Sequence, residues 1–293
     1  MQRAYLAGIE VSRVILGCGN FGGIGSAPEL FGQGESEDEA FAILDAAWAA
    51  GITAFDTADA YGGGRSETYL GAWLAARRPE GAVVTTKTFN PMAAGADRGL
   101  APGRVKRQVD SSLKRLGLER VDLFLTHAWD PSVPFAETAG ALDELVAAGK
   151  IGAYGVSNVD GAQLREAIAH GKPQWVQNSY SLLDRDAERD VLPLCREHGL
   201  GFTPFSPLAG GWLTGKYRRD APPPAGSRMT LRPDPYEHLK TDAVYDLIED
   251  LEARGDPATL AYAWLLAQPD VTAVVVGPRR PEQLAPALAA LSL

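Results

Sequence analysis

The sequence predicts a single (β/α)8 barrel of the α/β class, with an N-terminal β-hairpin and extra helices. Short apolar runs typical of strands alternate with amphipathic helical patterns at intervals of roughly 30 to 40 residues. The strand-like runs are continuously apolar, as is typical of a parallel sheet buried on both faces. No interdomain linker interrupts this order, so residues 1–293 are expected to form one barrel domain.

The hairpin comes first, with strands predicted at Arg3–Leu6 and Ile9–Ser12 on either side of a turn at Ala7-Gly8. The barrel strands are predicted at residues 14–16, 52–55, 82–86, 121–126, 151–156, 175–177, 201–203 and 272–276. A turn-rich stretch and a helical pattern follow these runs, as a βα unit requires.

Helices are predicted at residues 36–50, 66–77, 102–116, 134–148, 160–170, 187–198, 257–267 and 281–291, with an additional helix at 241–254. Ser36 and Glu39 have the spacing of a capping box. Glycines follow several helical runs, where a left-handed cap favours a residue without Cβ; these are Gly51, Gly149, Gly171 and Gly199. The proline-rich segment 216–240 is predicted to be a long surface loop.

The composition excludes some classes of function. A net charge of -9 and a pI near 5.0 argue against a nucleic-acid or anionic-membrane surface, which would need clustered Lys and Arg. No apolar stretch is long enough to span a bilayer, and no secretory leader is evident, so a cytoplasmic location is expected. Cys18 and Cys195 have no metal or redox spacing and are predicted to be packed thiols.

Four polar residues stand at or just after the ends of three consecutive predicted strands: Asp56, Tyr61, Lys87 and His127. The C-terminal ends of barrel strands face a common crevice, so these side chains are expected to meet there. An ammonium group beside a phenol lowers the phenol's pKa, so Lys87 would make Tyr61 a general acid. Asp56 would hold Lys87, and His127 would donate to a carbonyl oxygen.

Other chemistries fit less well. The segment from Gly17 to Gly22 has the G-x-G-x-x-G pattern of a dinucleotide fold, but no helical pattern follows the third glycine. We expect a loop over the barrel mouth instead. No G-x-S-x-G elbow of a serine hydrolase is present. The histidines are scattered, so no metal site is predicted.

The chain resembles the aldo-keto reductase family over nearly its whole length. The resemblance begins with Phe55-Asp56-Thr57-Ala58-Asp59-Ala60-Tyr61-Gly62 and Ser66-Glu67, and continues through Thr86-Lys87, residues 112–130, Gly155-Val156-Ser157-Asn158, Gln177-Asn178-Ser179-Tyr180 and Phe205-Ser206-Pro207-Leu208. It implies that Tyr61 is the proton donor, that Lys87 and Asp56 tune it, and that His127 orients the carbonyl.

The resemblance also implies a nicotinamide dinucleotide cofactor. Ser157, Asn158 and Gln177 would bind the carboxamide, and the ring of Tyr180 would stack on the nicotinamide. Residues of the phosphate and adenosine ends would be Ser206, Leu208, Gly211, Lys216, Gly277, Arg279 and Gln283. Arg279 suits a 2′-phosphate, so NADPH is expected rather than NADH. Many relatives have Asn at the position of Ala287, which puts an adenine contact there in doubt.

The expected function is therefore NADPH-dependent reduction of an aldehyde or ketone. Alternatives are an NADPH-binding regulatory subunit like the channel-associated β-subunits, and a reductase of a keto-sugar or other pathway intermediate. The expected partner is a small carbonyl compound. A long C-terminal loop like that of some relatives is not expected, so Phe21, Phe89 and Trp129 are the predicted walls of the substrate pocket. The oligomeric state is left open.

Overall fold

The computed structural model describes residues 1–293 and contains an eight-stranded parallel sheet in the order β10-β3-β4-β5-β6-β7-β8-β9. The strands are β3 (Val14–Gly17), β4 (Ala54–Asp56), β5 (Val83–Thr88), β6 (Val121–Thr126), β7 (Ile151–Ser157), β8 (Trp175–Gln177), β9 (Gly201–Phe202) and β10 (Val274–Val276). Two backbone hydrogen bonds join the end strands: Thr272 N to Phe202 O at 2.8 Å and Val275 N to Pro204 O at 3.0 Å. The sheet therefore closes, and the predicted (β/α)8 barrel is confirmed.

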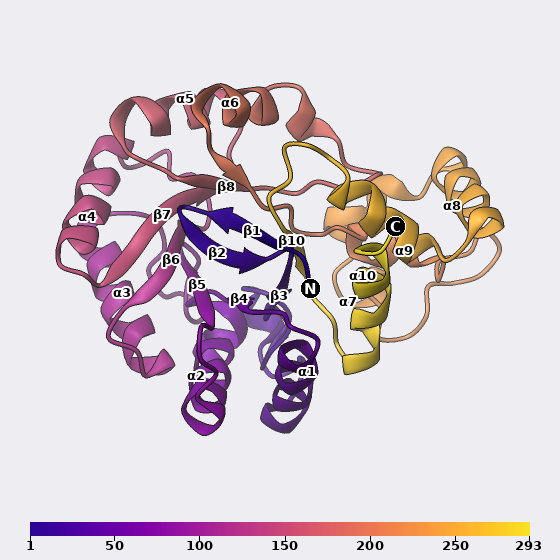
Figure 1. Cartoon of the computed structure of the whole chain (residues 1–293), viewed down its shortest axis with the longest axis horizontal. Helices are drawn as coiled ribbons and strands as arrows, with labels where there is room; N and C mark the ends of the chain where they lie inside the picture. The colour runs from indigo at the N-terminus through magenta and orange to yellow at the C-terminus, as the bar shows by residue number, and fades with distance from the viewer.

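Helices surround the strands (Figure 1). They are α1 (Glu37–Ala49), α2 (Arg65–Arg77), α3 (Pro102–Leu116), α4 (Phe135–Ala147), α5 (Gly161–His170), α6 (Val191–His198), α7 (Arg228–Leu231), α8 (Asp242–Arg254), α9 (Pro257–Leu266) and α10 (Ala285–Ala290). Helix α8 lies outside this ring, beside α9 (Figure 1). The capping box of Ser36 and Glu39 is present as predicted. The predicted left-handed cap at Gly171 is wrong, since the backbone of Gly171 is extended. The chain there packs closely against Phe135 and Ala139.

The barrel interior is a separate apolar cluster. Alternate residues of the strands point inward, and the cluster includes Ile15, Ala54, Val83, Leu123, Leu125, Trp175, Ala273 and Val275. The predicted hairpin, β1 (Arg3–Leu6) and β2 (Ile9–Ser12), adds Leu6 and Val11 to it. In Figure 1 the hairpin crosses the centre of the barrel, so it closes one end and leaves the other for a site.

The opposite faces of the strands pack on the helices in a larger cluster. Leu16, Phe55, Phe124 and Val176 belong to this outer layer and are fully buried. Each such side chain contributes roughly 1.5–3 kcal/mol by leaving water. The two layers explain why the strands are apolar on both faces, as the sequence predicted.

The segment 216–240 is more ordered than predicted. It contains α7 and a 3-10 helix at Asp234–Leu239 rather than a plain loop. Tyr217 and Leu239 are buried in a third apolar cluster with Trp212 of the 3-10 helix Ala209–Thr214 and with α8. These contacts give the proline-rich stretch a fixed place beside the barrel mouth.

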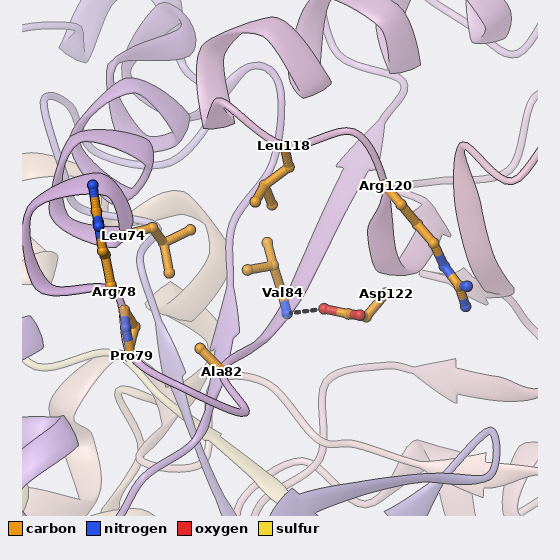
Figure 2. Close-up of a pocket in the computed structure, with 8 residues that line it drawn as sticks. All are labelled: Leu74, Arg78, Pro79, Ala82, Val84, Leu118, Arg120 and Asp122. Carbon is orange, nitrogen blue, oxygen red and sulfur yellow. Dashed lines mark hydrogen bonds between the residues drawn. The ribbon is translucent and has the colours of Figure 1, made fainter.

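A hollow of about 290 Å³ lies at the far end of the barrel from the predicted site (Figure 2). Val84 and Asp122, near the starts of β5 and β6, line it, and Val84 N donates to Asp122 Oδ2 at 2.9 Å. None of the predicted site residues reaches this hollow. The chain also has no helix with the length and apolar character needed to cross a membrane.

Candidate active site at the carboxyl ends of the strands

Strand register brings the predicted polar residues to one end of the barrel. The side chains of Ala54 and Leu125 point into the barrel. Asp56 follows Ala54 by two residues, and His127 follows Leu125 by two. Since side chains alternate along a strand, Asp56 and His127 also face the barrel axis, one layer above the apolar interior. The same period of two applies to Lys87, Ser157 and Gln177.

Lys87 and Asp56 form the buried base of the site. Lys87 Nζ donates to Asp56 Oδ1 and, at 2.9 Å, to the carbonyl oxygen of Thr57. The two side chains are only 1% and 5% exposed. Burial lowers the pKa of Lys87, but the charge of Asp56 and the hydrogen bonds with Asp56 and Tyr61 outweigh it, so the net shift is upward and the ammonium stays charged.

Tyr61 lies above this ion pair at the start of a 3-10 helix, Tyr61–Gly64, that follows β4. Its hydroxyl is 3.4 Å from Lys87 Nζ and 3.4 Å from His127 Nε2. The turn needs Gly62, whose φ is 57° and where a Cβ would come within 2.6 Å of the Phe21 carbonyl. Tyr61 and His127 are partly exposed, so they form the reachable surface of the site.

The pKa of Tyr61 differs from the sequence-based expectation. Burial raises it, and although Lys87 lowers it, the net shift is upward from 10.0. The error came from counting the neighbouring charge and not the desolvation of the phenol. Tyr61 is therefore protonated at neutral pH, the form that a proton donor needs.

His127 is held in its neutral form. Burial and the positive charge of Lys87 lower its pKa well below 6.5. Asn90 Nδ2 lies 3.4 Å from His127 Nδ1, a contact in which Nδ1 accepts and Nε2 carries the ring proton. Nε2 then points its hydrogen toward the hydroxyl of Tyr61, where an oxygen atom of a substrate would also be polarised.

Asp59 lies below the site in a buried polar network. Asp59 Oδ2 accepts from Thr88 Oγ1, and Thr88 Oγ1 accepts from Arg104 Nη1 at 2.9 Å. Asp59 Oδ1 has no hydrogen-bond partner. Burial raises the pKa of Asp59 to about 7. Because this pKa is higher in the folded than in the unfolded chain, protonation of Asp59 adds to the free energy of unfolding. That contribution is complete below about pH 4 and is lost as the pH rises through about 7.

We expect Asp59→Asn, which mimics the protonated acid, to gain stability relative to the unchanged protein as pH rises from 5.5 to 8.5. The gain between these two pH values is at most roughly 2 kcal/mol, because only the interval from pH 5.5 to the raised pKa of about 7 contributes. Urea unfolding at both pH values measures it. A difference that does not depend on pH would mean that Asp59 is ionised beside Arg104 throughout.

The three residues predicted to bind the carboxamide lie together. Ser157 Oγ donates to Gln177 O at 2.6 Å, and Asn158 Nδ2 donates to His127 O at 2.8 Å. Gln177 Nε2 donates to Asp56 Oδ2 at 2.9 Å. These bonds use the donors and leave the carbonyl oxygens of the Asn158 and Gln177 side chains as acceptors, which suits an incoming primary amide.

Tyr180 does not face the site, and its predicted stacking role is corrected here. Its side chain lies in the outer layer, with ring centroids 6.0 Å from Phe202 and 5.3 Å from Trp264. Its hydroxyl donates to Glu188 at 2.6 Å. Phe205, partly exposed and packed on the barrel interior, presents a ring at the mouth instead.

The segment predicted to bind the pyrophosphate is rich in glycine and in positive charge. Gly210 and Gly211 adopt φ values of 66° and 93°, and a Cβ on Gly211 would come within 2.4 Å of Lys216 Nζ. The pKa of Lys216 is lowered by partial burial and by the charges of Arg228 and Arg279. Such a gathering of cations over a glycine turn fits a dinucleotide pyrophosphate. Ser206 Oγ and Tyr236 Oη are 3.0 Å apart beside it, and Leu208 precedes the turn.

Among the residues predicted to contact the adenosine, Arg279 Nη1 donates to Gly226 O at 3.1 Å, and Gln283 Oε1 accepts from Arg279 N at 2.7 Å. Gly277 is exposed directly after β10. Ala287 is fully buried in the outer layer and offers no contact to an adenine, in line with the doubt raised by the sequence.

Comparison with known proteins decides the family. The model of the "Aldo/keto reductase family" matches residues 13–293. The chain belongs to this family. It is 36% identical to "Uncharacterized oxidoreductase YrpG" of Bacillus subtilis (strain 168), covering 100% of this chain and 92% of that protein. It is 34% identical to the "NADH-specific methylglyoxal reductase" of Escherichia coli (strain K12), covering 100% and 94%.

A solved aldo-keto reductase structure agrees with the fold. The glycerol dehydrogenase AKR11B4 from Gluconobacter oxydans superposes with a TM-score of 0.84 at 29% identity, covering 98% of this chain and 89% of that one. The oxidoreductase class and the barrel inferred from sequence are thus confirmed. The G-x-G-x-x-G segment is no Rossmann turn, since the next α-helix begins only at Glu37.

The three predicted pocket walls of this aldo-keto reductase differ in access. Phe21 and Phe89 are 1% and 7% exposed and belong to the outer core, so they support the mouth rather than line it. Trp129 is partly exposed and stacks on Phe135, with ring centroids 5.3 Å apart. Trp129 is the remaining candidate.

Sequence reasoning missed several side chains at the cofactor end. Arg228 Nη2 donates to Asn20 Oδ1 at 3.1 Å, and Arg279 Nε donates to Glu35 Oε1 at 2.7 Å. Both contacts join segments far apart in the sequence. No local sequence pattern marks these partners, because the segments meet only in the folded barrel. No group of three or more His, Cys, Asp or Glu side chains is arranged to hold a metal ion.

Proposed function

We propose that this aldo-keto reductase reduces an aldehyde or ketone to an alcohol, with Tyr61 as the proton donor. The observation that carries the proposal is the convergence of Tyr61 Oη, Lys87 Nζ and His127 Nε2 within 3.4 Å contacts at the barrel mouth. A protonated phenol, a charged ammonium and a neutral imidazole are the states that carbonyl reduction needs.

A bound nicotinamide supplies the hydride, and the residues present fit such a cofactor. Asn158 and Gln177 offer acceptors to its carboxamide, Phe205 offers a ring at the mouth, and Lys216 and Arg228 would neutralise the pyrophosphate. Ser157 holds the Gln177 backbone in place. We assign the stacking contact to Phe205, because Tyr180 is enclosed in the outer layer.

The protein's own groups then handle the proton. The carbonyl oxygen of the substrate would lie between Tyr61 Oη and His127 Nε2, where the imidazole hydrogen orients it. As negative charge develops on that oxygen, Tyr61 transfers its proton, and the phenolate that remains is stabilised by Lys87. Asp56 keeps Lys87 charged and in place.

The proposed cofactor is a nicotinamide dinucleotide, and Arg279 would favour NADPH where its guanidinium is free to meet a 2′-phosphate. The relative from E. coli is described as NADH-specific, so the preference has to be measured. A small carbonyl compound is the proposed substrate. We also propose a single-domain enzyme of the cytoplasm, supported by the two free buried thiols, Cys18 and Cys195.

The test is the loss of reduced-cofactor absorbance with NADPH and with NADH over aromatic aldehydes, diketones and keto-sugars. Turnover that depends on Tyr61 would support the proposal and identify the substrate class. Tight cofactor binding without turnover on any carbonyl would contradict the reductase assignment and favour the regulatory alternative. Cofactor binding is followed separately, through quenching of the tryptophan fluorescence.

A further inference from the structure

Arg279, the residue expected to bind a 2′-phosphate, is already paired with a buried carboxylate. Its Nε donates to Glu35 Oε1 at 2.7 Å, and the Glu35 side chain is 3% exposed. The contact is held by the fold: an isolated bridge joins Phe21 to Glu35, and Glu35 N donates to Asn20 O at 2.9 Å. The charge of the guanidinium is thus offset before any ligand arrives.

More negative charge lies next to this pair. Glu35 directly precedes α1, whose first turn carries Glu37, Asp38 and Glu39. Glu39 Oε2 accepts from Ser36 N at 2.8 Å, so a carboxylate of the protein already occupies the amide-rich start of this helix. Of these carboxylates, Glu39 lies close enough to Arg279 for the two charges to interact, so a dianionic phosphate at Arg279 would be repelled by Glu39 as well as by Glu35.

Glu35 also has an unused acceptor. Its Oε2 is buried and has no hydrogen-bond partner. A buried carboxylate oxygen without a donor is costly, and a ribose hydroxyl is a donor that would satisfy it. A carboxylate that accepts from the ribose 2′-hydroxyl is a general way to bind NADH, whereas a free arginine accommodates the 2′-phosphate of NADPH.

We infer that Glu35 is the residue that sets cofactor preference in this protein, by offsetting Arg279 and offering Oε2 to an unphosphorylated ribose. The inference rests on the proposed function, since it requires a dinucleotide whose adenosine end lies at Arg279. It predicts that the protein binds NADH at least as tightly as NADPH, despite the presence of Arg279.

The test compares Glu35→Gln with the unchanged protein. Glutamine keeps the shape and an acceptor for Arg279 but removes the charge. We expect the ratio of NADPH to NADH affinity to rise about tenfold, which corresponds to ~1.4 kcal/mol. Dissociation constants of both cofactors are measured by tryptophan fluorescence quenching, so the result does not depend on turnover. Thermal unfolding checks that the variant is folded.

Glu37→Gln is the matched control, because it removes the same charge from an exposed position two residues along. It is expected to leave the affinity ratio within about twofold. In the unchanged protein, AMP and adenosine 2′,5′-bisphosphate should compete with similar strength, a measurement that needs no variant.

The outcomes separate two failures. If both cofactors bind but Glu35→Gln leaves their ratio unchanged, or if the bisphosphate competes far better than AMP in the unchanged protein, the role of Glu35 is overturned. If neither cofactor binds the unchanged protein, the proposed function itself fails, and the inference falls with it.

Discussion

Tyr61→Phe is expected to lower turnover by roughly 10²-fold or more, the range for losing a general acid. The substitution removes only the hydroxyl that lies 3.4 Å from both Lys87 Nζ and His127 Nε2. The affinity for the reduced cofactor should change little, because the carboxamide and phosphate residues are untouched. Steady-state rates and fluorescence titrations measure the two effects separately.

Tyr5→Phe is the matched control for this loss. Tyr5 is 69% exposed on the hairpin, at the opposite end of the barrel, so the same chemical change there should leave turnover unaltered. Equal turnover in Tyr61→Phe and the unchanged protein would remove the proton-donor assignment. A parallel loss of cofactor binding would indicate a structural effect instead.

Lys87→Met is expected to reduce both stability and turnover. It leaves the buried Asp56 with no cationic partner, and breaking a buried pair in this way costs roughly 3–5 kcal/mol. Turnover should fall as well, because no ammonium remains to stabilise the phenolate of Tyr61. Urea unfolding gives the first quantity, and rates under conditions where the variant is folded give the second.

The double variant Asp56→Asn/Lys87→Met separates the two effects. It removes both charges and keeps an acceptor for Gln177 Nε2, so much of the lost stability should return. Turnover should stay low, because the ammonium is still absent. Recovery of turnover together with stability would show that Lys87 acts only by holding the fold.

The barrel and the meeting of four polar side chains at its mouth could be predicted because they depend on local patterns. Strand ends were visible as the last residues of apolar runs, and the carboxyl ends of barrel strands face one crevice, so Asp56, Lys87 and His127 were expected to meet there. Boundaries matched within a few residues, as at Val121–Thr126. A proline-rich composition, however, did not reveal the aromatic contacts that order 216–240.

The errors and omissions arose where a side chain's environment depends on tertiary packing. Tyr180 comes after the end of β8, where the period of two no longer tells which layer a residue faces. Glu35 looked like one acid among several before α1. Its pairing with Arg279 depends on loops brought together only by closure of the barrel.

The pairing of β3 with β10 has a consequence for how the chain folds. It joins Val14 to Val274, almost from one end of the chain to the other, and Gln2 Nε2 also donates to Leu291 O at 2.8 Å. Until the last strand has been synthesised, the growing sheet has unpaired edges on β3 and β9, which invite association with other chains. Contacts of this sequence separation form slowly. The chain is therefore most prone to aggregation after β9 has been synthesised and before β10 pairs with β3.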